Sequence, residues 1–284
     1  MVEILENYDE ETYHARPELS NSQLVDFLKS PLTYWSRHRS ESNNSFSPTA
    51  SMRIGSMVHK YILEGSDAFD ICYAQPPADG LRKPTSAQLT AKKPAEKTLE
   101  QIASWDEYEK SCAGKITTNP DELATAKRCI SSIEQSPVAQ ALLNQTTSTE
   151  QTIIYDLQGV PMRSRLDGVT NDSVIDIKTT TDASIDGFRR SIVKYNYGLQ
   201  AYIYSCAFYK AYGKFPKEFV FICVETIAPY HIGIYTLPNK YMSSMKHKAH
   251  DALMRFKNCN KHDVWPGYNN DHKVELPIRV YDND

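Results

Sequence analysis

Two carboxylates and a lysine lie close together in the segment RSRLDGVTNDSVIDIK, which spans residues 163–178. Asp167 stands at the end of one predicted strand, and Asp176 lies in the next strand, two positions before Lys178. Because a short turn joins these strands, the three side chains come within reach of one small volume. Paired carboxylates bind hard divalent cations through oxygen. A neighbouring lysine can orient or deprotonate a water molecule and offset the charge of a phosphate. The segment therefore predicts metal-assisted hydrolysis of phosphodiesters.

The apolar neighbours of Asp176 make a packing role hard to support. Ile175 and Ile177 flank Asp176 and point to the opposite face of the strand, so Asp176 and Lys178 share one face. Burial of a carboxylate in such a strand requires charged partners, hydrogen bonds or a metal ion. A purely structural ion pair between Asp176 and Lys178 remains the alternative.

A histidine in an earlier segment could complete a metal site. Residues 51–64 carry apolar side chains at helical spacing, and His59 lies inside this predicted helix. A neutral imidazole can ligate a divalent metal beside carboxylates, although an ordinary packed or surface histidine fits the same pattern. Gly55, one turn earlier, leaves space for a backbone or ligand to approach closely.

A third group lies on one face of a later predicted helix. Gln200 and Tyr204 are separated by one helical turn, and Tyr197 precedes Gln200 by a similar step, so their side chains share a face. They either form an aromatic stripe that packs on the sheet, or direct an amide and a phenol hydroxyl toward a metal-bound water or a phosphate.

The elements that must hold these residues follow from the periodicity of the apolar side chains. Ser20-Asn21-Ser22 begins a capped helix, which Ser30-Pro31 interrupts. Residues 40–50 and 75–98 are predicted to be loops. Further helices are predicted at 51–64, 99–112, 121–145 (divided at Pro137), 184–193, 196–212 and 239–257, and strands at 152–157, 160–169, 173–178, 219–226 and 231–237.

This order of elements predicts an α/β fold, with one central sheet of about five strands flanked by helices. No change of composition divides the chain, so residues 1–284 are expected to form a single domain. Within it, we expect an N-terminal helical region at about 19–64 and a long insert at about 75–135.

The composition limits the classes of protein that fit the chain. No run of about 18 apolar residues could span a membrane, and the polar N-terminus has no signal-peptide core. The six cysteines lack CxxC spacing, as expected for reduced thiols of a cytosolic protein. HExxH is absent, which disfavours a metalloprotease. The net charge of −3 does not by itself indicate nucleic-acid binding, although carboxylates in a metal site would lower the count.

In combination, these residues resemble the motifs of the PDDEXK nuclease superfamily, in the branch that contains the RecB nuclease domain and the RecE exonuclease (exonuclease VIII). That branch carries GxxxH on a helix, a strand aspartate, D-x-K and QxxxY, in this order. The corresponding residues here are Gly55-Ser-Met-Val-His59, Asp167, Asp176-Ile-Lys178 and Gln200-Ala-Tyr-Ile-Tyr204. The opening LSNSQLVDFLKSPLTYW and the late WPGY further resemble RecE-like, phage-associated proteins. The resemblance covers most of residues 19–268 but nothing in the segment 75–135.

The resemblance implies a restriction-endonuclease-like core with a mixed sheet and a site for one or two Mg²⁺ (or Mn²⁺) ions. It implies that the ion is held by His59, Asp167 and Asp176, together with the backbone carbonyl of Ile177. The cysteines lack the spacing of iron–sulfur members of the branch, so no cluster is expected.

The resemblance also implies roles in catalysis. Lys178 would orient or deprotonate the attacking water and steady the phosphate oxygens, while Gln200 and Tyr204 would act as positioning groups. Arg53 and Arg165 could grip a phosphate, because a planar guanidinium suits bidentate contact. A surface ion pair explains either arginine equally well.

RecE-like enzymes digest one strand of linear duplex DNA from its 5′ end, form ring-shaped tetramers and act with a single-strand annealing protein in recombination. By resemblance we expect the same here, in a bacterial cytoplasm. The basic loop 82–97 could contact DNA or another subunit, or be an ordinary surface loop. Two alternatives remain: an endonuclease or nickase of the same superfamily, and a non-catalytic DNA-binding protein on the same scaffold.

Overall fold

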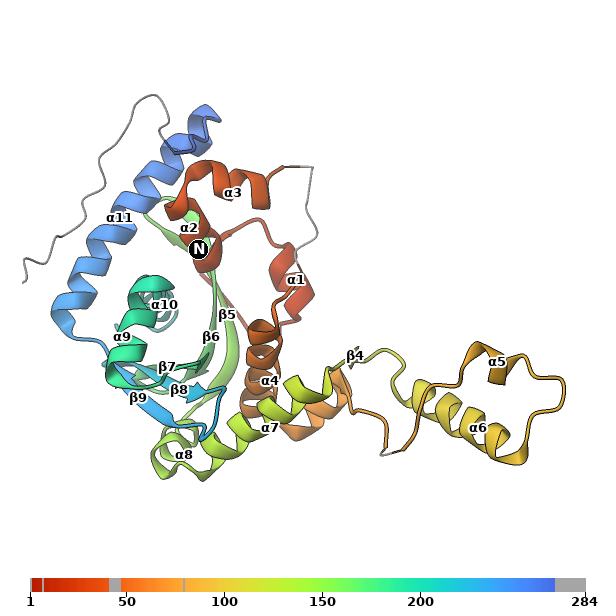
Figure 1. Ribbon diagram of the computed structural model, residues 1–284. Coiled ribbons are helices and arrows are strands. Elements are labelled where there is room, and N and C mark those ends of the chain that lie inside the picture. Colours follow the sequence, from red (N-terminus) through yellow and green to blue (C-terminus); the bar gives the residue numbers. More distant parts are fainter. Residues whose placement is uncertain (1, 7, 41–46, 79, 269–284) are drawn as a thin grey trace, which may run out of the picture.

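A mixed sheet lies at the centre of the protein (Figure 1), with strand order β1-β5-β6-β7-β8-β9 and with β2 beside β6. The structure is a computed structural model that describes residues 2–6, 8–40, 47–78 and 80–268. The architecture confirms the predicted α/β fold. The strands are β1 (Glu3–Leu5), β2 (Leu19–Ser20), β3 (Tyr73–Ala74), β4 (Ile116–Thr117), β5 (Ser148–Leu157), β6 (Val160–Val169), β7 (Ser173–Thr180), β8 (Glu218–Glu225) and β9 (Ile232–Thr236).

Helices cover both faces of the sheet (Figure 1). Each longer helix corresponds to one of the predicted helical segments. The helices are α1 (Glu10–Ala15), α2 (Asn21–Lys29), α3 (Pro31–His38), α4 (Ala50–Cys72), α5 (Ser86–Leu89), α6 (Glu96–Ser111), α7 (Pro120–Gln135), α8 (Pro137–Leu143), α9 (Ile185–Lys194), α10 (Tyr197–Tyr212) and α11 (Asn239–His262).

The hairpin of β5 and β6 sets the register of the central strands. Gln158 and Gly159 form the predicted turn, and their φ angles are 58° and 79°. Positive φ at both central residues is what a tight two-residue hairpin requires. From this turn β5 and β6 pair antiparallel along nearly their whole length.

β7 joins the two halves of the sheet. It pairs antiparallel with β6 at only two positions near the connecting turn, the last being Gly168 with Ile175. It pairs parallel with β8 along its whole length. A parallel pair requires a crossover connection, which α9 and α10 supply. Beyond Gly168 and Ile175, β6 and β7 have no paired positions.

Two hydrophobic clusters hold the layers together. On one face, α10 and α11 pack against the sheet through buried side chains such as Ile203 and Leu253. On the other face, α4 and α7 pack on β7 and β8, and this cluster includes Ile175 and Ile177. The neighbours of Asp176 therefore point away from it, as the strand periodicity predicts.

The N-terminal helices begin where the capping signals place them. Ser20 caps α2 in a capping box with Gln23, and Ser30 caps α3, whose first residue is Pro31. This confirms both the capped start and the interruption at Ser30-Pro31.

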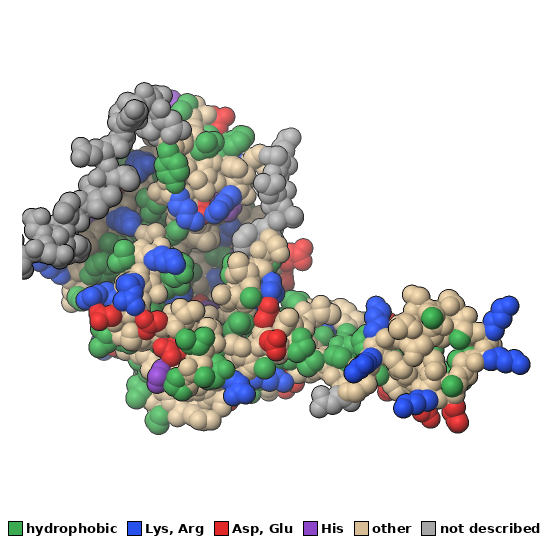
Figure 2. Space-filling model, in the orientation of Figure 1, with side chains coloured by type: hydrophobic (Ala, Val, Ile, Leu, Met, Phe, Trp, Pro, Cys, Tyr) green, Lys and Arg blue, Asp and Glu red, His purple; other side chains and the backbone are tan. Residues whose placement is uncertain are grey.

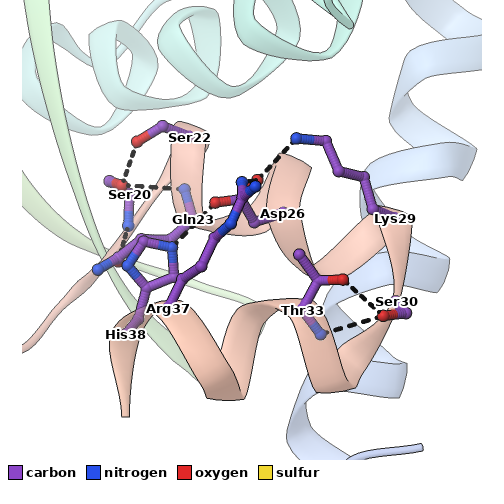
Figure 3. Close-up of polar contacts among 9 residues, drawn as sticks. All are labelled: Ser20, Ser22, Gln23, Asp26, Lys29, Ser30, Thr33, Arg37 and His38. Carbon is purple, nitrogen blue, oxygen red and sulfur yellow. Dashed lines mark hydrogen bonds and ion pairs between the residues drawn. The ribbon is translucent and has the colours of Figure 1, made fainter. Parts of the chain in front are cut away.

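Asp26 of α2 joins these two helices (Figure 3). Its carboxylate lies 2.9 Å from Lys29 Nζ, 2.7 Å from Arg37 Nη1 and 3.0 Å from His38 Nε2. Burial of the carboxyl tends to raise the pKa of Asp26, but the hydrogen bonds from His38, Lys29 and Arg37 outweigh it and hold the pKa below its ordinary value. The ion pairs fix the angle between α2 and α3.

Trp265, in the WPGY segment, attaches these helices to the rest of the chain. Its ring lies 6.5 Å from that of Phe27, 5.3 Å from that of Tyr34 and 5.9 Å from that of Phe256, measured between centroids. The segment that follows α11 therefore returns to cover the N-terminal helices.

The segment 75–135 contains two different parts. Its last helix, α7, lies against α4 and buries Leu123, Ala126 and Ile130 in the second cluster. The preceding helix, α6, has no buried residue. With α5 it forms an arm that projects from the body of the protein (Figure 1), and Lys and Arg side chains lie toward the far end of the arm (Figure 2).

Several short elements were not predicted. α1, α5 and the strands β1 to β4 are too short to show periodicity in a sequence. α4 continues beyond the predicted residues 51–64, through a kink at Gly65 with a φ of 91°. Residues 41–46 of the predicted loop 40–50, and the tail from 269 onward, lie outside the described residues. None of the described helices is both long enough and apolar enough to span a bilayer.

Candidate active site

Three carboxylates come into one row where β6 and β7 separate. Glu150 and Asp167 lie between the pairs Thr149–Gly168 and Gln151–Leu166 of β5 and β6, and Asp176 follows Ile175, the last β7 residue paired with β6. Side chains directly across antiparallel strands project from the same face. Three acids in one row repel one another unless protons or cations compensate them, so the row calls for positive charge.

Asp167 replaces the strand pairing that is lost at this point. Its Oδ2 accepts a hydrogen bond of 2.8 Å from the backbone N–H of Ile177, and the side chain is almost fully buried. The carboxylate thereby satisfies a backbone donor that β6 no longer reaches. The same bond fixes Asp167 against β7.

Glu150 was not among the predicted site residues, because the predicted strand 152–157 begins two residues after it, whereas β5 begins at Ser148. The hairpin turn at Gln158-Gly159 could have identified it. Glu150 lies eight residues before Gln158 (158 − 150) and Asp167 lies eight residues after Gly159 (167 − 159), so the two residues are at equal distances from the turn. The φ of Glu150 is 50°, a left-handed conformation that costs a non-glycine residue about 1–3 kcal/mol. No sequence pattern indicates that angle.

His59 reaches this row from α4. Its Nε2 lies 2.9 Å from the backbone carbonyl oxygen of Ile177, and its Nδ1 lies 3.5 Å from Asp167 Oδ2. The carbonyl can only accept, so Nε2 carries a proton in this arrangement. Nδ1 then faces a carboxylate, which is favourable only with a second proton or a metal cation between them. Gly55 allows α4 to come this close, because a Cβ there would lie 3.3 Å from Thr179 Oγ1.

Lys178 lies between a carboxylate and an aromatic ring. Its Nζ is 2.5 Å from Asp176 Oδ2 and 4.9 Å from the centroid of the Tyr197 ring. The close contact with Asp176 is an ion pair without hydrogen-bond geometry, so Oδ2 has no hydrogen-bond partner among the described residues although it is fully buried. The ammonium group of Lys178 compensates the charge of this buried oxygen.

The predicted positioning residues are on α10. Gln200 Nε2 donates a hydrogen bond of 3.0 Å to Asp176 Oδ1. Tyr204 lies one turn later, and burial raises the pKa of its hydroxyl well above the ordinary value. Gln200 therefore holds the carboxylate on the side opposite Lys178, and Tyr204 remains a neutral phenol.

The two predicted phosphate-binding arginines have different surroundings. Arg165 Nε lies 2.5 Å from Glu150 Oε2, within the row of acids. Arg53 makes a bidentate contact with Glu122, at 2.7 Å and 2.6 Å. The structure thus gives both arginines the ion-pair partners that the sequence left open, and only Arg165 contacts the carboxylate row.

Burial and mutual repulsion shift the titration of the acids. Burial first, and the charge of Asp167 second, raise the pKa of Glu150 to about 7. Burial also raises the pKa of Asp176 to about 6, although Lys178 opposes the shift. Burial disfavours the charged form of Lys178, but Asp176 and Asp167 outweigh it and raise the pKa of the amine. Lys178 is therefore an ammonium ion at neutral pH.

The donor atoms suit a divalent cation. One ligand atom from each of His59, Glu150 and Asp167 lies within 4.8 Å of the others. Ligands around one Mg²⁺ lie about 3–4 Å apart, so this group is slightly wider than a closed coordination shell. Carboxylate oxygens and one imidazole match Mg²⁺ or Mn²⁺. Asp176, also predicted as a ligand, lies beside this group with its carboxylate turned to Lys178 and Gln200.

A mixed sheet whose strands separate at a row of acids, with a lysine two residues beyond the last acid, defines a PDDEXK-like domain. The chain belongs to the family described as a PDDEXK-like domain of unknown function (DUF3799), whose model matches residues 20–274. A search of curated proteins found no match.

A solved structure shares the whole fold. A crystal structure of a Eubacterium rectale protein, which its description infers to be an exonuclease, matches with a TM-score of 0.61 over 96% of each chain. The two sequences are 13% identical, so the likeness establishes a common fold.

Proposed function

We propose that this protein is a metal-dependent deoxyribonuclease, and more narrowly a RecE-like 5′–3′ exonuclease that acts on linear double-stranded DNA in recombination or end resection. The observation that carries the proposal is the convergence of Glu150, Asp167, Asp176, Lys178 and His59 where β6 and β7 separate. A binding protein gains nothing from a buried lysine beside crowded acids, whereas phosphodiester hydrolysis requires such charges. The inferred activity of the structurally similar protein points in the same direction.

In this proposal Glu150, Asp167 and His59 hold Mg²⁺ or Mn²⁺, with Asp176 and the carbonyl of Ile177 as the adjoining donors. When bound, the cation lowers the pKa of its water and neutralises charge on the phosphate. Lys178, as an ammonium ion, donates hydrogen bonds to a phosphate oxygen or to the water. Gln200 keeps Asp176 in place, and Arg165 balances Glu150 until the substrate arrives.

The RecE-like branch brings further proposals. They are a ring-shaped homotetramer, a single-strand annealing protein as partner, a bacterial cytoplasmic location and an association with phage. Each rests on the motifs and on the RecE-like N-terminal segment, which forms α2 and α3.

The decisive experiment uses end-labelled linear duplex DNA with Mg²⁺, with 5′-phosphorylated and 3′-phosphorylated ends in parallel, and covalently closed circular DNA. The proposed exonuclease degrades only the linear DNA and releases label from the 5′ end first. Cleavage of the circle would identify an endonuclease or nickase. A mobility shift without degradation would identify a binding protein and refute the catalytic proposal.

A further inference from the structure

An aromatic column runs from the surface of the protein to its core beside the candidate active site. The Tyr195 and Tyr197 rings lie 5.5 Å apart between centroids at 31°, and the Tyr197 and Phe188 rings lie 6.0 Å apart at 29°. Phe188 in turn stacks on Tyr235 at 5.3 Å and 16°. Phe188 is buried and Tyr197 and Tyr235 are partly buried, whereas Tyr195 is 48% exposed. The column therefore ends at the surface with an open aromatic ring.

The backbone turn that bears the exposed ring is held in place. Tyr195 lies at the turn between α9 and α10, where its N–H bonds to Ser191 O at 2.9 Å. The next residue, Asn196, has a left-handed φ of 58° and accepts a hydrogen bond of 2.5 Å from Lys248 Nζ on α11. A ring on a fixed turn loses little conformational entropy when it binds a ligand.

The aromatic column also reaches Lys178 of the candidate active site. The ring of Tyr197 contacts Tyr195 directly. The ammonium group of Lys178 lies over the Tyr197 ring, 4.9 Å from its centroid. A ligand stacked on Tyr195 would thus lie one ring away from the amine that faces the carboxylate row. That spacing suits a group covalently attached to the phosphate on which Lys178 acts.

The surroundings of Tyr195 combine cations with exposed apolar side chains. Lys194 Nζ lies 5.1 Å from the Tyr195 ring centroid. Arg189 and Arg190 lie on the same helix and form exposed ion pairs with Asp186 and Asp182. Val193 is 69% exposed. Lys and Arg side chains lie over α9 and α10, with Asp and Glu side chains beside them (Figure 2). Aromatic rings among cations are the usual surface for unpaired nucleobases and their phosphates.

Lys194 does not block this surface. An exposed cation–π contact is weaker than base–aromatic stacking, so a base can replace the ammonium group on the ring. The displaced ammonium then becomes available to the phosphate backbone. A protein partner would gain less here, because it would have to neutralise the cations around so small an apolar area.

We propose that Tyr195 is a stacking platform for an unpaired nucleobase at the end of the DNA, next to the phosphodiester that reaches Lys178. This inference rests on the proposed nuclease function and names its substrate more closely as a frayed or single-stranded end rather than a fully paired one.

The test measures binding of short duplexes with single-stranded 5′ and 3′ ends, by fluorescence anisotropy in Ca²⁺, whose looser coordination is expected to disfavour turnover. One abasic site is moved through the last few positions of each overhang, and 2-aminopurine is placed at the same positions. The proteins are wild type, Tyr195→Ala, Tyr195→Phe and the control Tyr209→Ala. Tyr209 is 42% exposed and stacks on Phe215 at 4.6 Å, but it lies about 18 Å farther along α10.

We expect Tyr195→Ala to raise the Kd for one overhang about tenfold, and Tyr195→Phe and Tyr209→Ala to leave it unchanged. One abasic position should weaken wild-type binding and have no effect on Tyr195→Ala. 2-Aminopurine at that position should be quenched by wild type, Tyr195→Phe and Tyr209→Ala, but not by Tyr195→Ala.

Other results overturn the inference. Equal behaviour of Tyr195→Ala and Tyr209→Ala, in an enzyme that still digests DNA, would refute the platform and leave the nuclease proposal intact. A changed oligomeric state of Tyr195→Ala with unchanged DNA binding would assign the surface to a protein contact. A wild-type protein that neither binds nor digests DNA would refute both proposals.

Discussion

Glu150 and Asp167 lie on the neighbouring strands β5 and β6 with carboxylate oxygens within 4.8 Å of each other, so two carboxylates share one small volume. Burial, with the repulsion between them, raises the pKa of Glu150 to about 7. Arg165 and His59 relieve the repulsion only in part. In the folded protein, full ionisation of this acid pair is therefore favourable only when further positive charge lies beside it. Such a pair is preorganised to bind a cation.

Replacement of Glu150 by Gln should separate activity from stability. Gln keeps the shape beside Arg165, but it loses the charge that would hold the metal. DNA digestion should fall about 100-fold or more. The thermal midpoint in EDTA should stay equal or rise, because a buried repulsive charge is gone.

Glu107, exposed on α6, provides the matched control as Glu107→Gln. If Glu150→Gln digested DNA at the wild-type rate across a Mg²⁺ titration, the metal-binding assignment of Glu150 would be wrong.

Added Mg²⁺ should stabilise the folded protein, because the ion binds a carboxylate row that the unfolded chain lacks. At about 100 times the Kd the gain is about 2.7 kcal/mol, which calorimetry or a fluorescence melt would register as a higher Tm. Asp167→Asn should abolish most of this shift. A wild-type Tm that does not change when Mg²⁺ is added would argue against a metal site.

Loss of the imidazole should weaken metal binding more than it weakens the chemistry. For His59→Ala we expect the Mg²⁺ concentration at half-maximal activity to rise about tenfold or more, with partial recovery at high Mg²⁺. His262→Ala, which changes an exposed histidine at the end of α11, is the control. An unchanged Mg²⁺ titration curve would remove His59 from the ligands.

The pair of Asp176 and Lys178 should behave as one unit. Lys178→Met should reduce digestion by at least about 100-fold, and it should destabilise the fold by about 3–5 kcal/mol by leaving Asp176 buried without its cation. The double variant Asp176→Asn with Lys178→Met should recover much of that stability but no activity. Urea unfolding and DNA digestion measure the two effects, and digestion by either variant at the wild-type rate would contradict the assignment.

Acid should weaken the attachment of α2 to α3. The pKa of Asp26 is lower in the folded protein than in the unfolded chain, so its ion pairs stabilise the fold at all pH values above about 4. That contribution is lost as the pH falls below the ordinary pKa of aspartate toward the folded one. Asp26→Asn should cost about 1–2 kcal/mol at pH 7. The difference from wild type should shrink on acidification to pH 3, and a constant difference would exclude this origin.

The sequence by itself predicted the architecture and most of the residues that converge at the candidate site. Strand periodicity placed Asp176 and Lys178 on one face and their isoleucine neighbours in the core, because alternation along a strand is a local property. Capping signals located α2 and α3 in the same way. The positions of the Gln158-Gly159 turn and of Asp167 also implied a partner eight residues before the turn, although the predicted strand stopped short of it.

Only the tertiary structure decided which charges meet. Three contacts depend on packing between distant segments: Arg53 with Glu122, Arg165 with Glu150, and the Lys178 ammonium group with the ring of Tyr197. The left-handed backbone of Glu150 and the separation of β6 from β7 likewise have no local signal. Side-chain types and periodicity set which face a residue occupies, whereas its neighbours on that face follow from register and packing across the whole chain.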